Sequence, residues 1–438
     1  MEDSMKLLQV QVFFRHGART PLFHVKSNVV PEAIWSPDLS TDLPHTLYPY
    51  RLVDISTQKQ VELTPDYLNR LYVLPGGNRV GELTKGGQQD AYNLGIRLKK
   101  QYTGKNCNFL SKTFEPSQFY MRTTFIARTI KSLRCVVAGL IGDDIDSVDS
   151  KLRSTPVTFD CEKLNAEILF PNPNTHEIIL QLFKHGTNEC SKSKNHQEVK
   201  STLRQILGVE RLIDCVEQRP ADYDCPIYFV RDDYLARKQA GFPIPSELDK
   251  LLPHLDNLSS QELLHEILGK RKDWETNVHI IFNDIFSLIL SNLINYEKLP
   301  QFHLYACHDS SLMLLLFGLN VFDGCWPPFA ADLIFELYTT KTSSSSSSSS
   351  CCQSTSSHLR PGDNSLTLVD YKNSEKLNNL WFRLLYLGKP IPLKSLWNLS
   401  SYSNGYDMLD NDTLSSSSSL VPLKVLYEKL EEAKTLKH

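Results

Sequence analysis

One pattern occurs three times in this chain and restricts the fold more than any other feature. A short run rich in β-branched and aromatic residues, of the kind that forms a buried strand, is followed by a cluster of polar side chains. The three runs are Leu7–Phe14, Gln118–Met121 and Gln301–Cys307, and the clusters begin at Arg15, Arg122 and His308. The carboxyl ends of parallel strands share one edge of an open α/β sheet, and ligands bind there. The sequence therefore predicts an α/β fold in which the three clusters converge.

The first cluster, Arg15-His16-Gly17-Ala18-Arg19-Thr20-Pro21, places two guanidinium groups around one imidazole. Guanidinium groups fork onto phosphate oxygens, and a histidine at the end of a strand can attack phosphorus. A basic surface loop would be the alternative, but a chance match of five specified positions is on the order of one in a few million. Like-charge repulsion from Arg15 and Arg19 is expected to lower the pKa of His16 and keep it neutral at mildly acidic pH.

The second and third clusters are each followed by a predicted helix. Apolar residues at helical spacing run from Ile126 to Leu140, and Leu312–Phe317 opens another apolar helix. Asp309, Ser310 and Ser311 would be good caps for the latter, so a capping role alone is an alternative for this cluster.

Together the clusters predict a site for a phosphate or sulfate dianion, formed by Arg15, His16, Arg19, Arg122, His308 and Asp309. Asp309 is the only carboxylate in this set, which suits the transfer of a single proton to a leaving group. No zinc spacing, Walker loop or carboxylate-rich metal cluster is present in the sequence. We expect no metal and no cofactor.

These residues resemble those of the histidine acid phosphatase family, branch 2 of the histidine phosphatase superfamily. The family pattern R-H-G-x-R-x-P is matched by Arg15–Pro21, and its later His-Asp pair by His308-Asp309. Its intermediate arginine motif is matched by Arg122-Thr123-Thr124 with Arg128-Thr129, and its L-T-x-x-G turn by Leu83–Gly87. Phe125 departs from the pattern, because the family often has Asp or Asn after the arginine triplet.

The resemblance implies a three-layer α/β/α domain with an inserted helical cap, and a phosphomonoesterase that works through phosphohistidine. By this resemblance His16 is the nucleophile and Asp309 the general acid and base. Arg15, Arg19, Arg122 and His308 bind the phosphate.

A narrower similarity, to family members that act on lysophosphatidic acid, lies in Leu7–Val10, Ser132–Cys135, Gly139-Leu140 and Trp326–Ala330. It implies hydrolysis of a 1-acylglycerol 3-phosphate, with Phe23, Trp35, Trp326 and Phe329 as candidates to line an acyl channel. A broad-specificity acid phosphatase and a phytase-like inositol polyphosphate phosphatase are the alternatives. A phosphoglycerate mutase-like enzyme fits less well, because there the acid is typically a glutamate located between the nucleophile and the second histidine.

The motifs bracket a middle stretch that contains none of them, which predicts two lobes in a chain of 438 residues. We expect a catalytic α/β domain formed by 1–154 and 275–438, and a helical cap formed by 155–274 that packs with 23–80. Helical patterns at Val199–Leu207 and Gln261–Leu268 are separated by several prolines, including Pro226, Pro245 and Pro253. The Ser-rich tracts near 343–357 and 415–419 are expected to be disordered loops in the catalytic domain.

Charge and hydropathy narrow the choice of partners. A formal charge of −3 gives no general attraction to nucleic acid, and the longest apolar stretch is too short to span a bilayer. We expect a monomer that binds a small phosphomonoester or a lysophospholipid, at most with transient contact to a membrane surface. The resemblance implies a mitochondrial location if a targeting segment precedes this chain, and a cytoplasmic one otherwise. The ten cysteines have no repeated spacing.

Overall fold

The computed structural model describes residues 5–64, 72–104, 109–142, 156–183, 192–212, 225–340, 375–393 and 419–435. The Ser-rich tract 343–357, residues 415–418 of the second tract, and five of the cysteines lie outside these ranges. The strands are β1 (Met5–Arg15), β2 (Tyr50–Asp54), β3 (Gln60–Val61), β4 (Phe119–Thr124), β5 (Val157–Glu162), β6 (Phe302–Cys307), β7 (Asp332–Thr340), β8 (Leu380–Tyr386), β9 (Lys389–Pro390) and β10 (Val421–Pro422). The helices are α2 (Lys85–Tyr102), α3 (Ala127–Ile141), α5 (Lys194–Leu207), α6 (Ile227–Ala240), α7 (Ser246–Leu268), α8 (Trp274–Ile281), α9 (Asn283–Ile294), α10 (Asp309–Gly318), α11 (Glu375–Asn378) and α13 (Leu423–Thr435).

A single mixed sheet organises the molecule. Its order is β10-β8-β7-β1-β6-β4-β5-β2-β3, with β9 paired to β8. The five strands β1, β6, β4, β5 and β2 run parallel, whereas β7 is antiparallel to β1. The three predicted strands are therefore neighbours in the order β1-β6-β4, and their carboxyl ends meet at one edge.

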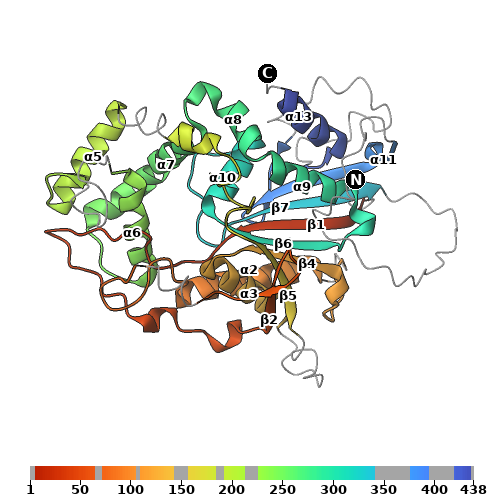
Figure 1. The fold of residues 1–438 in the computed structure, drawn as a ribbon, viewed down its shortest axis with the longest axis horizontal. Helices are drawn as coiled ribbons and strands as arrows, with labels where there is room; N and C mark the ends of the chain where they lie inside the picture. Colours follow the sequence, from red (N-terminus) through yellow and green to blue (C-terminus); the bar gives the residue numbers. More distant parts are fainter. Residues whose placement is uncertain are drawn as a thin grey trace.

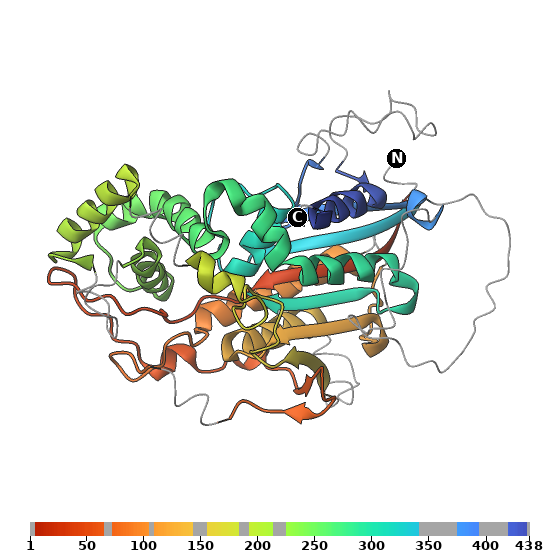
Figure 2. The ribbon, with the colours of Figure 1, turned by 45° about the horizontal axis from the view of Figure 1, so that its top comes forward.

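Helices cover both faces of this sheet, which confirms the predicted three-layer α/β/α architecture. One core cluster packs α2 and α3 against side chains such as Val12 and Phe14. The other packs α8, α9, α10 and α13 against the opposite face, where Phe13 and Tyr305 stack with ring centroids 4.4 Å apart. The alternation of Phe13 and Phe14 between two cores follows from the two-residue period of a strand. Figures 1 and 2 show the helical layers on either side of the sheet.

Three further helices, α5, α6 and α7, lie beyond the carboxyl end of β1 and are called the cap below (Figure 1). They share a separate hydrophobic cluster to which Val25 and Val30 also belong. Trp35 and Leu74 pack with Ala236 of α6 in another. The segment that follows the first cluster of charged residues is thus folded onto these helices.

Several predicted boundaries were wrong. Arg122-Thr123-Thr124 belongs to β4 and does not end it, since these residues continue the ladders with β5 and β6. Pro253 was expected to break a helix, but it lies inside α7 at an exposed position. Leu252 and Leu255 of the same helix are buried, so packing of the buried face can hold the helix despite the missing hydrogen bond. Pro226 and Pro245 are the residues just before α6 and α7, as a proline at a helix start permits.

Candidate active site

The predicted residues converge because of the register of three strands. Arg15 at the end of β1 is paired with Cys307 at the end of β6, and Thr123 of β4 with Ala306. His16 continues from β1, and its backbone N–H donates to the Cys307 carbonyl at 3.2 Å. His308 follows β6 directly. The rings of His16 and His308 lie edge to face with centroids 5.7 Å apart.

The loop that carries His16 is pressed against the start of α2. The Thr84 N–H and hydroxyl both donate to the Ala18 carbonyl, at 3.0 and 3.1 Å. The same hydroxyl caps the helix by accepting from the Gly87 N–H at 3.2 Å. Gly17 donates its N–H to the Ser132 hydroxyl of α3 at 3.1 Å. The Leu83–Gly87 turn therefore acts on the nucleophile loop, since it fixes the path of the backbone from Gly17 to Ala18.

His16 is fully buried and its tautomer follows from one contact. Its Nδ1 lies 2.9 Å from the Gly17 carbonyl, which can only accept, so Nδ1 carries the proton. Nε2 is left with a lone pair. Burial lowers the pKa of His16 well below its ordinary value, and the positive charges of Arg128, Arg15 and Arg19 lower it further. The predicted lowering of the His16 pKa is confirmed in direction, with burial and Arg128 as added causes. The role of His16 as nucleophile stays a prediction.

Arg15 and Arg19 flank this imidazole and are almost fully buried. Arg15 donates to the Asp309 Oδ2 atom at 2.7 Å and to the Pro327 carbonyl at 2.6 Å. Burial lowers the pKa of Arg15 to about 10, which still leaves it charged at neutral pH. Arg19 donates to the Thr20 carbonyl at 3.1 Å, so protein groups hold both guanidinium groups in place.

Asp309 is the first residue of α10 and lies against Arg15. Its Oδ2 also accepts from the Trp326 indole N–H at 3.0 Å, and its Oδ1 from the Ser310 N–H at 2.9 Å. Burial acts to raise the pKa of Asp309, but Arg15, Arg19 and the Trp326 N–H together hold it well below its ordinary value. Asp309 is thus an ionised carboxylate in the same cluster as His16, and its role as general acid and base stays a prediction.

His308 is the N-cap of α10 and forms a capping box with Ser311. Its Nε2 lies 3.1 Å from the Thr124 hydroxyl and its Nδ1 lies 3.5 Å from an Arg128 nitrogen. Burial and Arg128 lower the pKa of His308 well below its usual value. Its role as a phosphate ligand remains a prediction.

Arg122 and Arg128 differ in their surroundings. Arg122 projects from β4 and donates to the buried Glu167 carboxylate at 2.7 Å. Arg128, in the first turn of α3, is the cation that most lowers the pKa of both His16 and His308, apart from the effect of burial. Arg122 was predicted to be the third phosphate-binding arginine, and that role stays a prediction. The structure also places Arg128 beside the two histidines, and the Arg128-Thr129 part of the family motif was the signal that could have found it.

The prediction that Asp309 is the only carboxylate in the cluster was wrong. Asp232 of α6 accepts from both terminal nitrogens of Arg19, at 2.8 and 3.2 Å, and from the Leu22 N–H at 2.7 Å. Glu167 engages Arg122. Both acids lie in stretches of sequence without motifs, so no local signal points to them.

The segment Trp326–Ala331 packs against the loop that carries His16. Phe329 places its ring 4.1 Å from the Arg15 guanidinium carbon, with its centroid 6.0 Å from that of His16. The Ala330 N–H donates to the His16 carbonyl at 3.1 Å, and the Ala331 carbonyl accepts from the Arg15 N–H at 2.8 Å. This tryptophan and phenylalanine were predicted to lie near the motifs, and the structure places both at the cluster.

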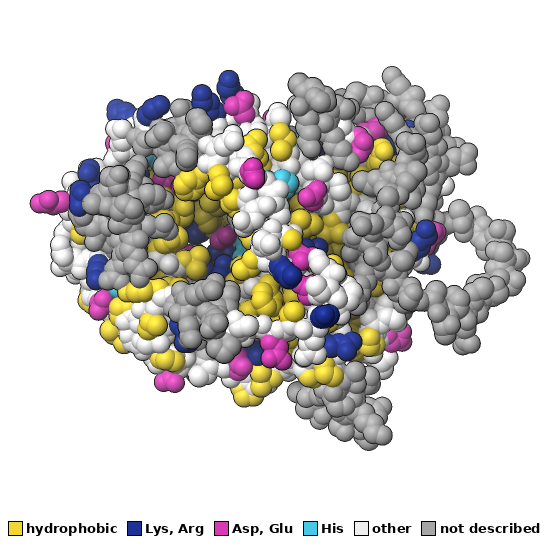
Figure 3. All heavy atoms as spheres, in the orientation of Figure 1, with side chains coloured by type: hydrophobic (Ala, Val, Ile, Leu, Met, Phe, Trp, Pro, Cys, Tyr) yellow, Lys and Arg dark blue, Asp and Glu magenta, His cyan; other side chains and the backbone are white. Residues whose placement is uncertain are grey.

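Further aromatic side chains contact His308 and Trp326 or lie next to those that do. Phe170 stands edge-on to His308, with centroids 5.7 Å apart. Tyr228 lies 6.2 Å from Trp326, and Phe23 stacks on Phe229 at 3.5 Å. Figure 3 shows a hollow between the cap and the α/β domain, with a mainly hydrophobic rim and charged side chains at its base. Trp35, by contrast, is fully buried in the cluster with Leu74, which does not place it in a channel.

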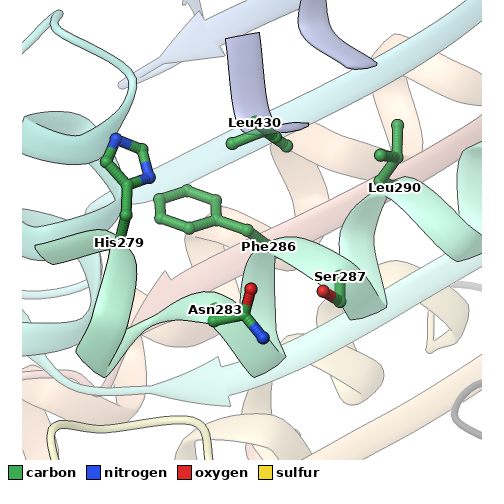
Figure 4. A pocket seen from close by; sticks show the side chains of 6 residues that line it. All are labelled: His279, Asn283, Phe286, Ser287, Leu290 and Leu430. Carbon is green, nitrogen blue, oxygen red and sulfur yellow. The ribbon is translucent and has the colours of Figure 1, made fainter. Parts of the chain in front are cut away.

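A separate small hollow lies between α8, α9 and α13 (Figure 4). Phe286, Leu290 and Leu430 line it with His279, whose pKa is lowered to about 4 by burial. It shares no residue with the cluster around His16. In the described ranges, no group of three or more His, Cys, Asp or Glu side chains is arranged to hold a metal ion. Within those ranges too, no single helix is long and apolar enough to cross a membrane, and only the bent pair 271–281 and 283–294 meets that test when counted together.

Comparison with known proteins agrees with this geometry. A family model of the histidine phosphatase superfamily (branch 2) matches residues 6–205. Lysophosphatidic acid phosphatase type 6 of Homo sapiens is 29% identical over 343 residues, which cover 76% of this chain and 74% of that protein. Lysosomal acid phosphatase of Xenopus laevis is 22% identical over a match that covers 77% of this chain and 67% of that protein. The phytase from Citrobacter braakii has a similar fold, with a TM-score of 0.51 and 15% identity over 98% of both chains.

Proposed function

Because the chain belongs to the histidine phosphatase superfamily (branch 2), we propose that it is an acid phosphatase that hydrolyses phosphomonoesters through a phosphohistidine on His16. One observation carries this proposal. A buried imidazole with a free Nε2 lone pair lies among arginine side chains and in the same cluster as a carboxyl group.

In the first step, His16 Nε2 attacks phosphorus as the ester oxygen leaves. Arg15, Arg19 and Arg128 balance the charge on the phosphoryl oxygens, which is the main requirement of phosphoryl transfer. The substrate dianion attracts Arg15 away from Asp309 and adds negative charge beside it, which raises the pKa of Asp309; the carboxyl group then takes up a proton and gives it to the departing alkoxide. In the second step Asp309 accepts a proton from water, which attacks phosphohistidine and releases phosphate.

Lysophosphatidic acid is the substrate that we propose. The similarity to lysophosphatidic acid phosphatases extends over three quarters of the chain, and a hollow with a hydrophobic rim and charged side chains at its base suits a phosphate joined to one acyl chain. Phe170, Tyr228 and Phe23 are the side chains proposed to contact the acyl chain. Each methylene that they bury would contribute at most about 0.8 kcal/mol.

The test is phosphate release from lysophosphatidates of graded chain length, below their micelle concentrations, beside glycerol 3-phosphate and inositol hexakisphosphate. We expect kcat/KM to rise with chain length until the groove is filled, and phosphatidic acid to be a poorer substrate. Equal rates at all chain lengths, or a preference for inositol hexakisphosphate, would reject lysophosphatidic acid and leave the chemistry at His16 in place.

The role of Asp309 is tested separately by the leaving group. Asp309→Asn should slow an alkyl phosphate far more than p-nitrophenyl phosphate, because only the basic alkoxide needs a proton as it departs. Equal losses on both substrates would remove Asp309 from the role of general acid.

A further inference from the structure

Trp326 connects the cap to Asp309. Its indole N–H donates to Asp309 Oδ2 at 3.0 Å, on the same oxygen that accepts from Arg15 at 2.7 Å. The indole is itself buried, with 8% of its surface exposed. Arg15 and Trp326 both donate to the carboxylate, but only Trp326 is uncharged, so its hydrogen bond does not depend on the charge balance of the phosphate pocket.

The cap holds the indole in turn. Arg231 of α6 lies over the Trp326 ring, with its guanidinium carbon 4.6 Å from the ring centre. Its Nε donates to Asp256 of α7 at 2.5 Å, which fixes the guanidinium plane. The next residue of α7, Asn257, donates to the Gly324 carbonyl at 3.2 Å and so ties down the loop that leads to Trp326.

We propose that Trp326 is a positioning residue for Asp309, and that Arg231 and α7 keep the indole in place. The inference rests on the proposed phosphatase function. A substrate dianion will attract the Arg15 guanidinium, and the hydrogen bond from Arg15 to the carboxylate weakens when that occurs. The Trp326 N–H then remains on Oδ2 and keeps the carboxyl group aimed at the leaving oxygen. The cap thereby contributes to the chemical step and is more than a wall of the cleft.

The indole also acts on the ionisation of the carboxyl group. The groups that face Asp309 are Arg15 from β1, Arg19 and His308 from the neighbouring loops, and the Trp326 N–H, and all of them lower its pKa against the effect of burial. Loss of the N–H removes one donor to the ionised form. The pKa of Asp309 should then rise, and with it the pH above which alkyl substrates lose the proton donor.

Trp326→Phe tests this, because it removes the N–H and keeps an aromatic ring beneath Arg231. Trp274→Phe is the matched control: its indole N–H is also in a hydrogen bond, but to the backbone carbonyl of Gly269 at 2.9 Å, and it lies in the core beside Phe317. For each variant, kcat is measured against pH with 2-glycerophosphate and with p-nitrophenyl phosphate. The ratio of the two rates is independent of the fraction of enzyme that is folded.

We expect Trp326→Phe to lower kcat on 2-glycerophosphate about tenfold relative to p-nitrophenyl phosphate, the effect of one hydrogen bond to a charged group. The limb of the pH profile set by Asp309 should move to higher pH. Trp274→Phe should leave the ratio unchanged. An unchanged ratio in Trp326→Phe, or equal losses on both substrates, would overturn the proposal.

Arg231→Met tests whether Arg231 keeps the Trp326 indole in place. It should produce the same selective loss on 2-glycerophosphate, with KM unchanged. A rise in KM on both substrates with an unchanged ratio of kcat values would mean that Arg231 binds the substrate anion and does not position Trp326. If the unaltered enzyme hydrolysed neither ester, the proposed function itself would fail, which is a distinct result.

Discussion

Gly87 lies so close to Ala18 that a methyl group on its α carbon would overlap the Ala18 carbonyl oxygen. Gly17 faces Gly87 in the same way, since a Cβ atom there would overlap the Gly87 carbonyl. Neither glycine has a positive φ, so it is the close backbone approach that requires them. The nucleophile loop and the first turn of α2 are therefore packed backbone against backbone.

Gly87→Ala should inactivate the enzyme and lower its melting temperature, because the added methyl group must displace the backbone beside His16. Gly86→Ala is the matched control on the same helical turn, where the nearest atom to an added Cβ is the Thr84 hydroxyl at 3.8 Å. It should keep activity and gain up to about 1 kcal/mol in unfolding free energy from helix propensity. Thermal melts and phosphate-release assays of the two variants measure these differences. Similar behaviour of the two variants would contradict the packing argument.

Activity on p-nitrophenyl phosphate should not fall as the pH is lowered from about 7 to about 5, the range in which an ordinary histidine gains a proton. Burial and three arginines lower the pKa of His16, so its Nε2 stays unprotonated there. Rapid quench should trap an acid-labile, alkali-stable phosphoenzyme, and His16→Ala should abolish it. A loss of activity centred near pH 6.5 would show that the imidazole titrates normally.

Arg128→Ala should reduce kcat/KM about 100-fold on alkyl and aryl esters alike, because the phosphoryl charge is common to both. Lys131→Ala, one turn further along α3 and paired with Glu82, is the control and should change little. Arg122→Ala should act first on stability, since it leaves the Glu167 carboxylate buried without its cation, at about 3–5 kcal/mol. If Arg122→Ala folds normally and loses more activity than Arg128→Ala, the assignment must return to Arg122.

Glu262 should contribute a decrease in unfolding free energy as the pH rises from about 5 to about 8. Burial raises the pKa of Glu262 to about 8, so the folded protein holds a proton that the unfolded chain releases above about 4.3. This stabilisation is complete below the unfolded pKa and is lost as the pH passes the folded one.

Glu262→Gln should therefore be more stable than the parent at pH 8, by on the order of a few kcal/mol, and similar to it at pH 4.5. Glu247→Gln, an exposed position on the same helix, is the control and should show no such difference. Melting curves of the three proteins at both pH values make the comparison. A parallel pH dependence in the parent and Glu262→Gln would exclude Glu262 as its source.

The sequence alone determined the α/β class and the convergence of Arg15, His16, His308 and Asp309. The two-residue period of a strand and the polar cluster that follows it are local properties of the sequence, and parallel strands bring their carboxyl ends to one edge of the sheet. The same local patterns located the ends of α3 and α10 closely, whereas α5 begins at Lys194, well before the predicted Val199.

Only the tertiary structure decided which oppositely charged side chains form ion pairs. Asp232 pairs with Arg19 and Glu167 with Arg122 across 213 and 45 residues of sequence, and Arg128 reaches the histidines from a helix that begins after the motif strand. Trp326 meets Asp309 from a loop held by the cap. Such pairings depend on how helices and loops pack around the sheet, and a single sequence contains no local signal for a contact made between distant segments.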